Sequence, residues 1–295
     1  MKILVTGGTG FLGRPVVGLL LEQGHEVLLV TRHPESVAAR WPRAFILAAD
    51  DSMSNKARTL SRCGPDTFLH MAWEGLPDYS PEQSCRNLEM GAHYLSLALD
   101  SGVRRIVGVG TCLEYGACHG PQLETNAPAE IAESFPQAKI ALHSFIRSVV
   151  HEHDLEYRWA RPFFVYGPGQ RETSLIPSAL RAARVGKRMA PRDKSAAVDF
   201  VHVTDVARGI CTLTTDSGPS GAFNLGSGSP RSTQWIADTV FSEASGLNCV
   251  EGHDRNVSDG DGWWADISYT ESSYGWRPTI SIQDGIRQLV ASGIS

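Results

Sequence analysis

Short apolar runs alternate along the first half of the chain with longer segments of helical periodicity. The runs are rich in β-branched residues and are bounded by glycine, proline or asparagine. Strands that are apolar on both faces are typical of a parallel sheet covered by helices on both sides. The pattern therefore predicts a doubly wound α/β fold. Its strands are expected at 2–6, 26–31, 44–49, 67–72, 105–110 and 157–162, and its long helices at 85–101 and 137–153.

The second half of the chain departs from this alternation. Beyond the sixth predicted strand, proline, glycine and polar residues become denser, although a strand at 199–203 and a helix at 233–244 interrupt them. We therefore predict a main domain over residues 1–165 and a smaller C-terminal lobe over residues 166–295. Some segments of this lobe are expected to return to the main domain.

Composition and charge narrow the classes of function. The 295 residues are 42% hydrophobic and carry a net charge of -5, with no basic run. A chain of this kind can bury a full core, and it lacks the electrostatic signature of a nucleic-acid partner. No secretory signal and no stretch of membrane-spanning length is visible, so we expect a cytoplasmic protein without a membrane partner. The six cysteines form no CxxC pair, which argues against a structural metal.

A glycine-rich turn follows the first predicted strand and opens a helix. Gly7 permits the tight turn, Gly10 lets the backbone approach a pyrophosphate, and Gly13 allows helix and strand to pack closely. A purely structural turn is the alternative, but the position between strand and helix favours a dinucleotide site, which makes the main domain a Rossmann domain. The expected contacts to the cofactor are Gly7, Thr9, Gly10, Phe11, Leu12 and Gly13.

The end of the second strand bears on which dinucleotide is bound. An NAD site places an acidic residue there, whereas this chain has Thr31 and Arg32. Arginine can pair with a 2′-phosphate, and we expect no carboxylate to repel that phosphate, so NADP(H) is favoured over NAD(H). A solvated surface arginine is the alternative. Asp50, at the end of the third strand, is either an adenine contact or a turn former.

Motifs along nearly the whole chain resemble one enzyme family. The chain is similar to the extended branch of the short-chain dehydrogenases/reductases, the NAD-dependent epimerase/dehydratase family, which acts mostly on nucleotide sugars. The matching stretches are TGGTGFLG, HMAW, GTCLEYG, RPFFVYGPG, DFVHVTDVARG and FNLGSG. On this resemblance, Ala72 and Arg161 would also contact the cofactor.

The resemblance implies a catalytic set with one member missing. In the family, a tyrosine and a lysine one helical turn apart work with a serine or threonine that follows the fifth strand. Thr111 and Lys139 occupy two of these positions, and Phe135 occupies the tyrosine position. Residues four apart share one face of a helix. Phenylalanine keeps the ring but has no proton to transfer, whereas Lys139 can still bind the nicotinamide ribose.

Three explanations of Phe135 remain open. The residue is an engineered Tyr-to-Phe substitution, or the enzyme uses another acid, or the protein has lost catalysis and binds or senses NADP(H). Candidates for another acid are Tyr115, His119 and Cys112. A plain core or staple role of Phe135 is a further possibility, because Pro136 suits the first helical position and would put the ring at the helix boundary.

The resemblance also suggests a reaction. No Asp-Glu pair follows Thr111, which disfavours a dehydratase, and GTCLEYG together with the later motifs looks most like 4-ketoreductases of nucleotide-activated 4-keto-6-deoxy sugars. A 4-epimerase is the alternative, although Arg32 argues against the tightly held NAD that it needs. A homodimer is expected through the helices at 85–101 and 137–153. Expected contacts to the nucleotide sugar are Trp73, Glu114, Tyr115, Phe164, Arg171 and Arg192.

Overall fold

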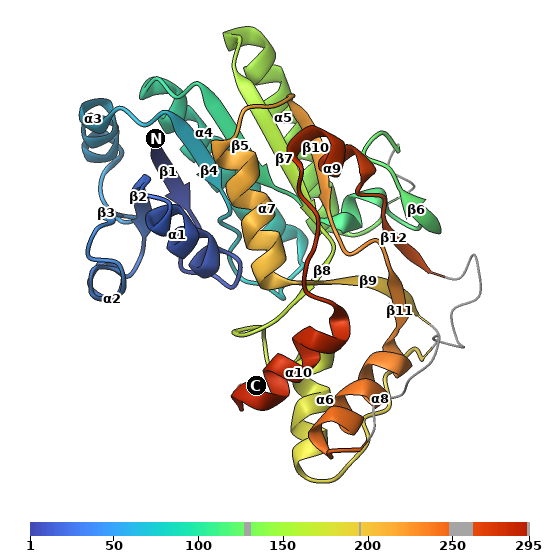
Figure 1. The fold of residues 1–295 in the computed structure, drawn as a ribbon. Helices are drawn as coiled ribbons and strands as arrows, with labels where there is room; N and C mark the ends of the chain where they lie inside the picture. Colours follow the sequence, from blue (N-terminus) through green and yellow to red (C-terminus); the bar gives the residue numbers. More distant parts are fainter. Residues whose placement is uncertain (127–130, 195, 248–261, 294–295) are drawn as a thin grey trace. The chain divides into compact units, whose positions relative to one another are not determined.

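The computed structural model describes residues 1–126, 131–194, 196–247 and 262–293. Within these residues, a seven-stranded sheet has the strand order β10-β7-β5-β4-β1-β2-β3 (Figure 1). Strands β1 to β5 and β7 pair in parallel, which confirms the predicted doubly wound α/β fold. The strands are β1 (Lys2–Thr6), β2 (Glu26–Thr31), β3 (Phe45–Ala48), β4 (Thr67–His70), β5 (Arg105–Val109), β7 (Glu156–Pro162) and β10 (Gly221–Leu225).

Helices cover the sheet because each turns an apolar stripe toward it. Residues of α3, α4 and α5 form one core with the strands, and α4 packs along α5. The Cys211 thiol of α7 donates to the Val16 carbonyl of α1 at 3.6 Å, which ties those two helices together. The helices are α1 (Gly13–Glu22), α2 (Pro34–Arg40), α3 (Met53–Cys63), α4 (Pro81–Asp100), α5 (Ser134–His153) and α7 (Val203–Thr215).

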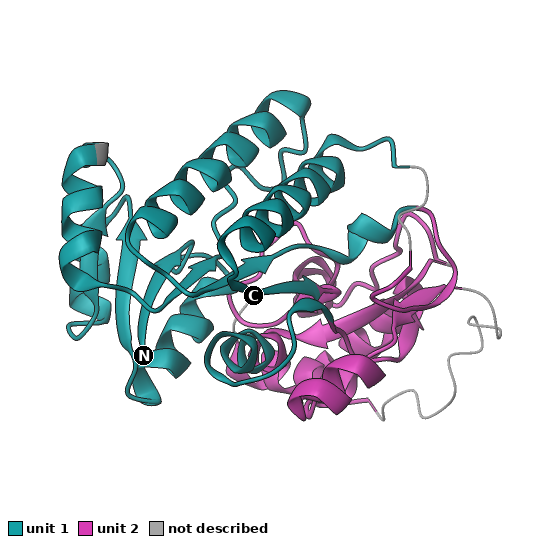
Figure 2. Ribbon diagram, turned by 90° about the horizontal axis from the view of Figure 1, so that it is seen from above, with its two compact units in different colours: residues 1–116, 128–161, 207–223 teal, residues 117–127, 162–206, 224–295 magenta. Residues whose placement is uncertain are grey.

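The chain divides into two compact units (Figure 2). Unit 1 comprises residues 1–116, 128–161 and 207–223, and unit 2 comprises residues 117–127, 162–206 and 224–295. Unit 2 has its own core, in which Tyr166, Ile236 and Ile286 are fully buried. Its elements are β6 (Gly120–Gln122), β8 (Phe164–Tyr166), β9 (Ala197–His202), β11 (Pro230–Ser232), β12 (Trp263–Ala265), α6 (Leu175–Arg184), α8 (Thr233–Ala244), α9 (Ser268–Tyr274) and α10 (Ile282–Ser292).

The register of unit 1 brings the ends of its strands to one edge of the sheet. Thr6 pairs with His70, and His70 pairs with Gly108. The segments that follow β1, β2, β4 and β5 therefore begin at the same edge, which is where ligands bind in open α/β sheets. Three predicted strands end one or two residues early, at Ala48, His70 and Val109, because the next residues leave the sheet to form these segments.

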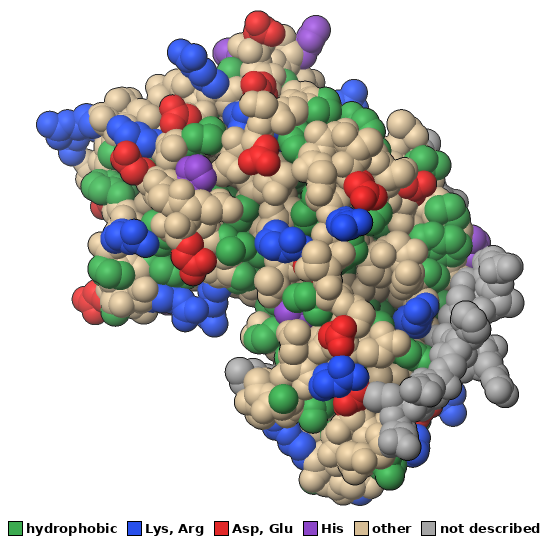
Figure 3. Space-filling view, in the orientation of Figure 1, with side chains coloured by type: hydrophobic (Ala, Val, Ile, Leu, Met, Phe, Trp, Pro, Cys, Tyr) green, Lys and Arg blue, Asp and Glu red, His purple; other side chains and the backbone are tan. Residues whose placement is uncertain are grey.

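Surface features bear on the expected partners. On the face shown in Figure 3, basic and acidic side chains are interspersed among the described residues. None of the described helices is both long and apolar enough to cross a membrane. The predicted homodimer stays a prediction: Leu97 and Val149 of its two helices are buried in the core of unit 1, whereas Phe145 is 46% exposed. Five cysteines are free thiols, and Cys249 lies outside the described residues.

Candidate active site

The turn between β1 and α1 is built from backbone that excludes side chains. Gly7 has φ +76°, and a Cβ there would lie 2.5 Å from the backbone nitrogen of Ala72. A Cβ on Gly13 would lie 2.1 Å from the Gly7 carbonyl oxygen. Gly10 is exposed, and a Cβ there would meet only the Gly7 carbonyl oxygen, at 3.3 Å. The turn therefore closes on itself and leaves its outer surface open to a ligand.

The start of α1 fits the pyrophosphate of a dinucleotide. The side chain of its N-cap residue, Leu12, accepts no hydrogen bond from the helix, and no acidic residue stands in the first turn. The first N–H groups of a helix have no partner within it and carry a partial positive charge. Anions bind at such helix ends. The predicted contacts Thr9 and Phe11 lie on the same turn, where the Thr9 carbonyl accepts from Arg14 Nε at 2.8 Å.

The end of β2 carries an ion pair that sequence reasoning missed. Arg32 Nη1 lies 3.2 Å from Glu74 Oε1, and the two side chains are 64% and 41% exposed. The expectation that no carboxylate opposes a phosphate at Arg32 considered only the end of β2 and is wrong. Glu74 belongs to the loop after β4. Asp50 is exposed in the turn after β3.

Lys139 reaches from α5 to the end of β5. Its Nζ donates to the Val109 carbonyl at 2.7 Å and lies 4.1 Å from the ring centroid of Trp73. Val109 is the last residue of β5, so the ammonium group lies beside the segment that begins with Thr111. The lysine is 4% exposed, and burial lowers its pKa to about 7, against the opposing effect of the Glu114 carboxylate.

Phe135 lies in the first turn of α5 and packs against two aromatic rings. Its ring centroid is 5.3 Å from that of Trp73, edge to face, and 5.1 Å from that of Tyr79. Only 8% of Phe135 is exposed. The helix begins at Ser134, two residues before the expected first position at Pro136, and proline is tolerated there because first-turn N–H groups have no helical partner.

Thr111 is fixed by a reciprocal cap on a short 3-10 helix, η1 (Cys112–Tyr115). Its Oγ1 accepts from the Leu113 N–H at 3.3 Å, and Glu114 Oε1 accepts from the Thr111 N–H at 2.9 Å. A threonine hydroxyl that accepts one bond still has its proton to donate. The cap therefore holds the threonine side chain in a defined orientation at the edge of the sheet.

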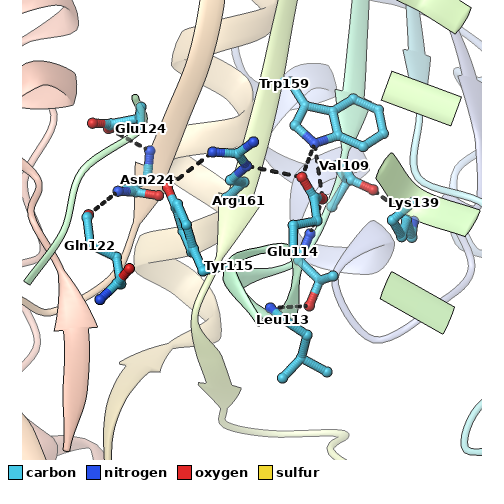
Figure 4. A network of polar contacts seen from close by, with 11 residues as sticks. Val109, Leu113, Glu114, Tyr115, Gln122, Glu124, Lys139, Trp159, Arg161 and Asn224 are labelled. Carbon is cyan, nitrogen blue, oxygen red and sulfur yellow. Dashed lines mark hydrogen bonds and ion pairs between the residues drawn. The ribbon is translucent and has the colours of Figure 1, made fainter. Parts of the chain in front are cut away.

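Glu114 is an internal residue. Its carboxylate accepts from Trp159 Nε1 at 3.0 Å and from Arg161 Nε at 2.9 Å (Figure 4). Glu114 is 1% exposed, and burial raises its pKa while Arg161 opposes the rise. The predicted substrate contact Glu114 and cofactor contact Arg161 are thus each other's partners, and their ligand roles stay predictions.

The candidates for a replacement acid lie in different places. Tyr115 is 2% exposed, and its hydroxyl accepts from Arg161 Nη1 at 3.1 Å. Cys112 is 3% exposed. His119 is exposed and belongs to unit 2. Tyr79, which sequence reasoning missed, is 44% exposed and contacts Phe135 directly.

His70 is a second residue that sequence reasoning missed. Its Nδ1 lies 2.8 Å from Thr6 Oγ1, and its buried Nε2 has no hydrogen-bond partner among the residues that the structure describes. Burial, with a smaller contribution from Lys139, lowers its pKa to about 3. A neutral imidazole at the end of β4 thus adds no positive charge beside Lys139.

The remaining predicted substrate contacts belong to unit 2. Phe164 packs against Trp263 with ring centroids 5.5 Å apart, and Arg171 and Arg192 are exposed. Within the same unit, the Asn224 side chain donates to the Gln122 carbonyl at 2.7 Å (Figure 4). The substrate-binding roles of Phe164, Arg171 and Arg192 stay predictions.

Comparisons with known proteins point to one family. The model of the NAD dependent epimerase/dehydratase family matches residues 3–226. The chain is 27% identical to a dTDP-6-deoxy-L-talose 4-dehydrogenase (NAD(P)(+)) of Kitasatospora kifunensis, over 98% of this chain and 94% of that protein. It is 28% identical to a 3-diazoavenalumate denitrifying reductase of a Streptomyces species, over 80% of this chain and 79% of that protein. The fold resembles that of UDP-N-acetylglucosamine 4-epimerase from Bacillus cereus, with a TM-score of 0.83, 18% identity and 99% and 96% of the two chains covered.

Proposed function

Because the chain belongs to the NAD dependent epimerase/dehydratase family, we propose that its site is that of an NADPH-dependent reductase for the C4 keto group of a nucleotide-activated 4-keto-6-deoxy sugar. The observation that carries this proposal is the bond from Lys139 Nζ to the Val109 carbonyl. It joins the lysine of α5 to the end of β5, just before Thr111. The same ammonium group lies over the ring of Trp73, which packs against Phe135. The constellation lacks one atom of a reductase site, the hydroxyl oxygen at position 135.

The chain's own residues divide the work of carbonyl reduction. A bound reduced nicotinamide would supply the hydride. The Thr111 hydroxyl keeps its proton free to donate to the carbonyl oxygen, because its hydrogen bond from Leu113 uses only a lone pair. Lys139 would bind the ribose of the cofactor through its remaining N–H donors. Phe135 supplies no proton, so the alcohol oxygen is protonated slowly in this chain.

The choice of NADPH rests on Arg32. Its guanidinium is exposed at the end of β2 and can form charge-assisted bonds with a 2′-phosphate. The neighbouring Glu74 limits this advantage, so the preference for NADPH over NADH is expected to be modest. A relative whose name includes NAD(P)(+) accords with a site that accepts both forms.

The test uses Phe135→Tyr and NADPH that carries deuterium at the transferable position. The variant is incubated with a dTDP-4-keto-6-deoxyhexose, and the product is analysed by mass spectrometry and NMR. The proposal expects one deuterium at C4 of the product sugar. A parallel incubation with UDP-glucose, which carries a hydroxyl group at C4, tests for an epimerase: inversion of that C4 centre without net consumption of NADPH would indicate one. Binding of NADPH without affinity for the nucleotide sugar would indicate a protein that only binds the cofactor.

Phe135 also favours a second candidate, a reduction that consumes no proton. When a diazonium carbon exchanges N2 for hydrogen, it takes up a hydride and releases N2, so no acid is needed. One relative is named as a denitrifying reductase of a diazo compound, and the rings of Trp73, Phe135 and Tyr79 would accept an aromatic cation. NADPH-dependent release of N2 from an aryldiazonium salt, corrected for the reaction without protein, tests this candidate. Equal rates for the parent chain and for Phe135→Tyr are expected.

A further inference from the structure

The loop after β4 connects the two ends of the site through three consecutive residues. The backbone nitrogen of Ala72 lies against Gly7, Trp73 lies under the Lys139 ammonium, and Glu74 pairs with Arg32. The path of this loop explains why Glu74 reaches β2. Because the loop crosses the end of β1 at Gly7, two further residues are enough to reach the neighbouring strand.

The position of Glu74 is set by α4. Its backbone N–H donates to Asn87 Oδ1 at 2.6 Å, and its carbonyl accepts from Asn87 Nδ2 at 3.0 Å and from Gln83 Nε2 at 3.1 Å. Asn87 is 1% exposed. These three bonds fix the backbone of Glu74, so its carboxylate moves only by rotation of the Glu74 side chain.

The charges at this point distinguish the two dinucleotides. NADP(H) carries a 2′-phosphate on its adenosine ribose, with up to two negative charges, and NAD(H) carries a hydroxyl there. Arg32 attracts the phosphate, whereas Glu74 occupies the guanidinium and repels the same phosphate. The hydroxyl of NAD(H) carries no charge for Glu74 to repel, and a carboxylate can accept a hydrogen bond from it. The carboxylate therefore opposes the binding of NADP(H) and does not oppose that of NAD(H).

We propose that Glu74 is a specificity-determining residue that weakens the binding of NADP(H), but not of NAD(H), by pairing with Arg32. This proposal rests on the cofactor binding of the proposed function. Such an effect would limit the preference for NADPH that an arginine at the end of β2 favours. The pair is exposed, so its effect is limited to a few-fold and is screened by salt.

The test measures dissociation constants of NADPH and NADH by quenching of tryptophan fluorescence, without turnover. We expect Glu74→Gln to tighten NADPH binding about fivefold and to change NADH binding less than twofold. In the Arg32→Ala background, the same substitution should tighten NADPH binding less than in the parent chain. At 0.5 M salt the difference should shrink.

Glu82→Gln is the matched control. Glu82 lies in the first turn of α4, and its substitution changes the net charge of the chain equally. It should leave the ratio of the NADPH and NADH dissociation constants unchanged. If Glu74→Gln weakens NADPH binding or leaves it unchanged, Glu74 orders Arg32 or is neutral, and the proposal is wrong while the proposed function stands. If neither the parent chain nor any variant binds NADPH or NADH, the proposed function is wrong as well.

Discussion

The two ends of the candidate site are built on different physical principles. At the nucleotide end, the backbone of the β1–α1 turn makes the surface, and added side chains at Gly7 or Gly13 would collide with it. At the catalytic end, side chains of Thr111, Phe135 and Lys139 make the surface, held by partners that do not depend on the missing hydroxyl. An added side chain at the nucleotide end therefore blocks cofactor binding by steric collision. At the catalytic end, a substitution can remove the proton donor and leave the packing unchanged.

The largest expected effect on cofactor binding is at the nucleotide end. Gly13→Ala places a Cβ 2.1 Å from the Gly7 carbonyl oxygen, where backbone cannot yield cheaply. We expect NADPH binding to weaken by on the order of a hundredfold or more, because a shift of one ångström misplaces the phosphate contacts. Isothermal titration calorimetry measures the effect. Gly18→Ala is the control, since its Cβ meets nothing within 4 Å, and unchanged binding by both variants would contradict a backbone-built site.

The second prediction concerns the buried ion pair beneath the catalytic end, between Glu114 and Arg161. Glu114→Gln removes the charge that faces Arg161 in the interior, and breaking a buried pair from one side costs about 3–5 kcal/mol. The free energy of unfolding from urea titration should fall by about that amount. Glu172→Gln, in the exposed pair with Arg181, should change it by less than about 0.5 kcal/mol. Similar decreases in the free energy of unfolding of both variants would mean that the buried ion pair stabilises the fold no more than the exposed pair does.

Lys139 gives the catalytic end a pH dependence. Its pKa is about 7 in the folded chain and 10.5 as the ordinary value, so between these values the unfolded chain binds the extra proton. The free energy of unfolding contributed by this group therefore rises with pH over that range, by at most about 1.4 kcal/mol per pH unit. Urea titrations from pH 7 to 9.5 should show the parent chain gaining stability relative to Lys139→Met. A difference that does not change with pH would place the ammonium in a wetter environment.

The smallest expected effect concerns the choice between NADPH and NADH at the nucleotide end. Arg32→Ala removes a positive charge at the end of β2 that attracts a 2′-phosphate, so the NADPH preference should narrow by about threefold to fivefold. Parallel titrations with NADPH and NADH at low salt measure the ratio. A ratio that stays the same in this variant would show that Arg32 has no part in cofactor choice.

The fold and the nucleotide turn could be predicted because both follow from local sequence. Continuous apolar strands, glycines between strand and helix, and motifs along the chain predicted the parallel sheet and the family, and both are confirmed. An NAD(P)-dependent oxidoreductase of that family is confirmed with them. The proximity of Lys139 in α5 to the end of β5 was implied only by the resemblance, because no local sequence pattern links Lys139 to Val109.

The residues that were missed are brought together by the register of the sheet. Glu74 and Tyr79 follow β4, but their partners lie elsewhere: Arg32 follows β2, and Phe135 lies in α5. Such contacts depend on strand order and on the path of one loop, which sequence spacing does not reveal. The start of α5 was misplaced by two residues because proline at the third helical position looks the same in sequence as proline at the first.

The central claim is that the site lacks only the hydroxyl at position 135. Single-turnover oxidation of NADPH by the parent chain and by Phe135→Tyr, with the same 4-keto-6-deoxy sugar nucleotide, tests it most directly. Cofactor affinity should hardly change, because the glycine turn and Lys139 are untouched. The account predicts a rate at least on the order of a hundredfold higher in the variant, the usual contribution of a positioned acid. Equal, measurable rates in the two forms would contradict it and would place the proton donor elsewhere, with Tyr79→Phe as the next variant to measure.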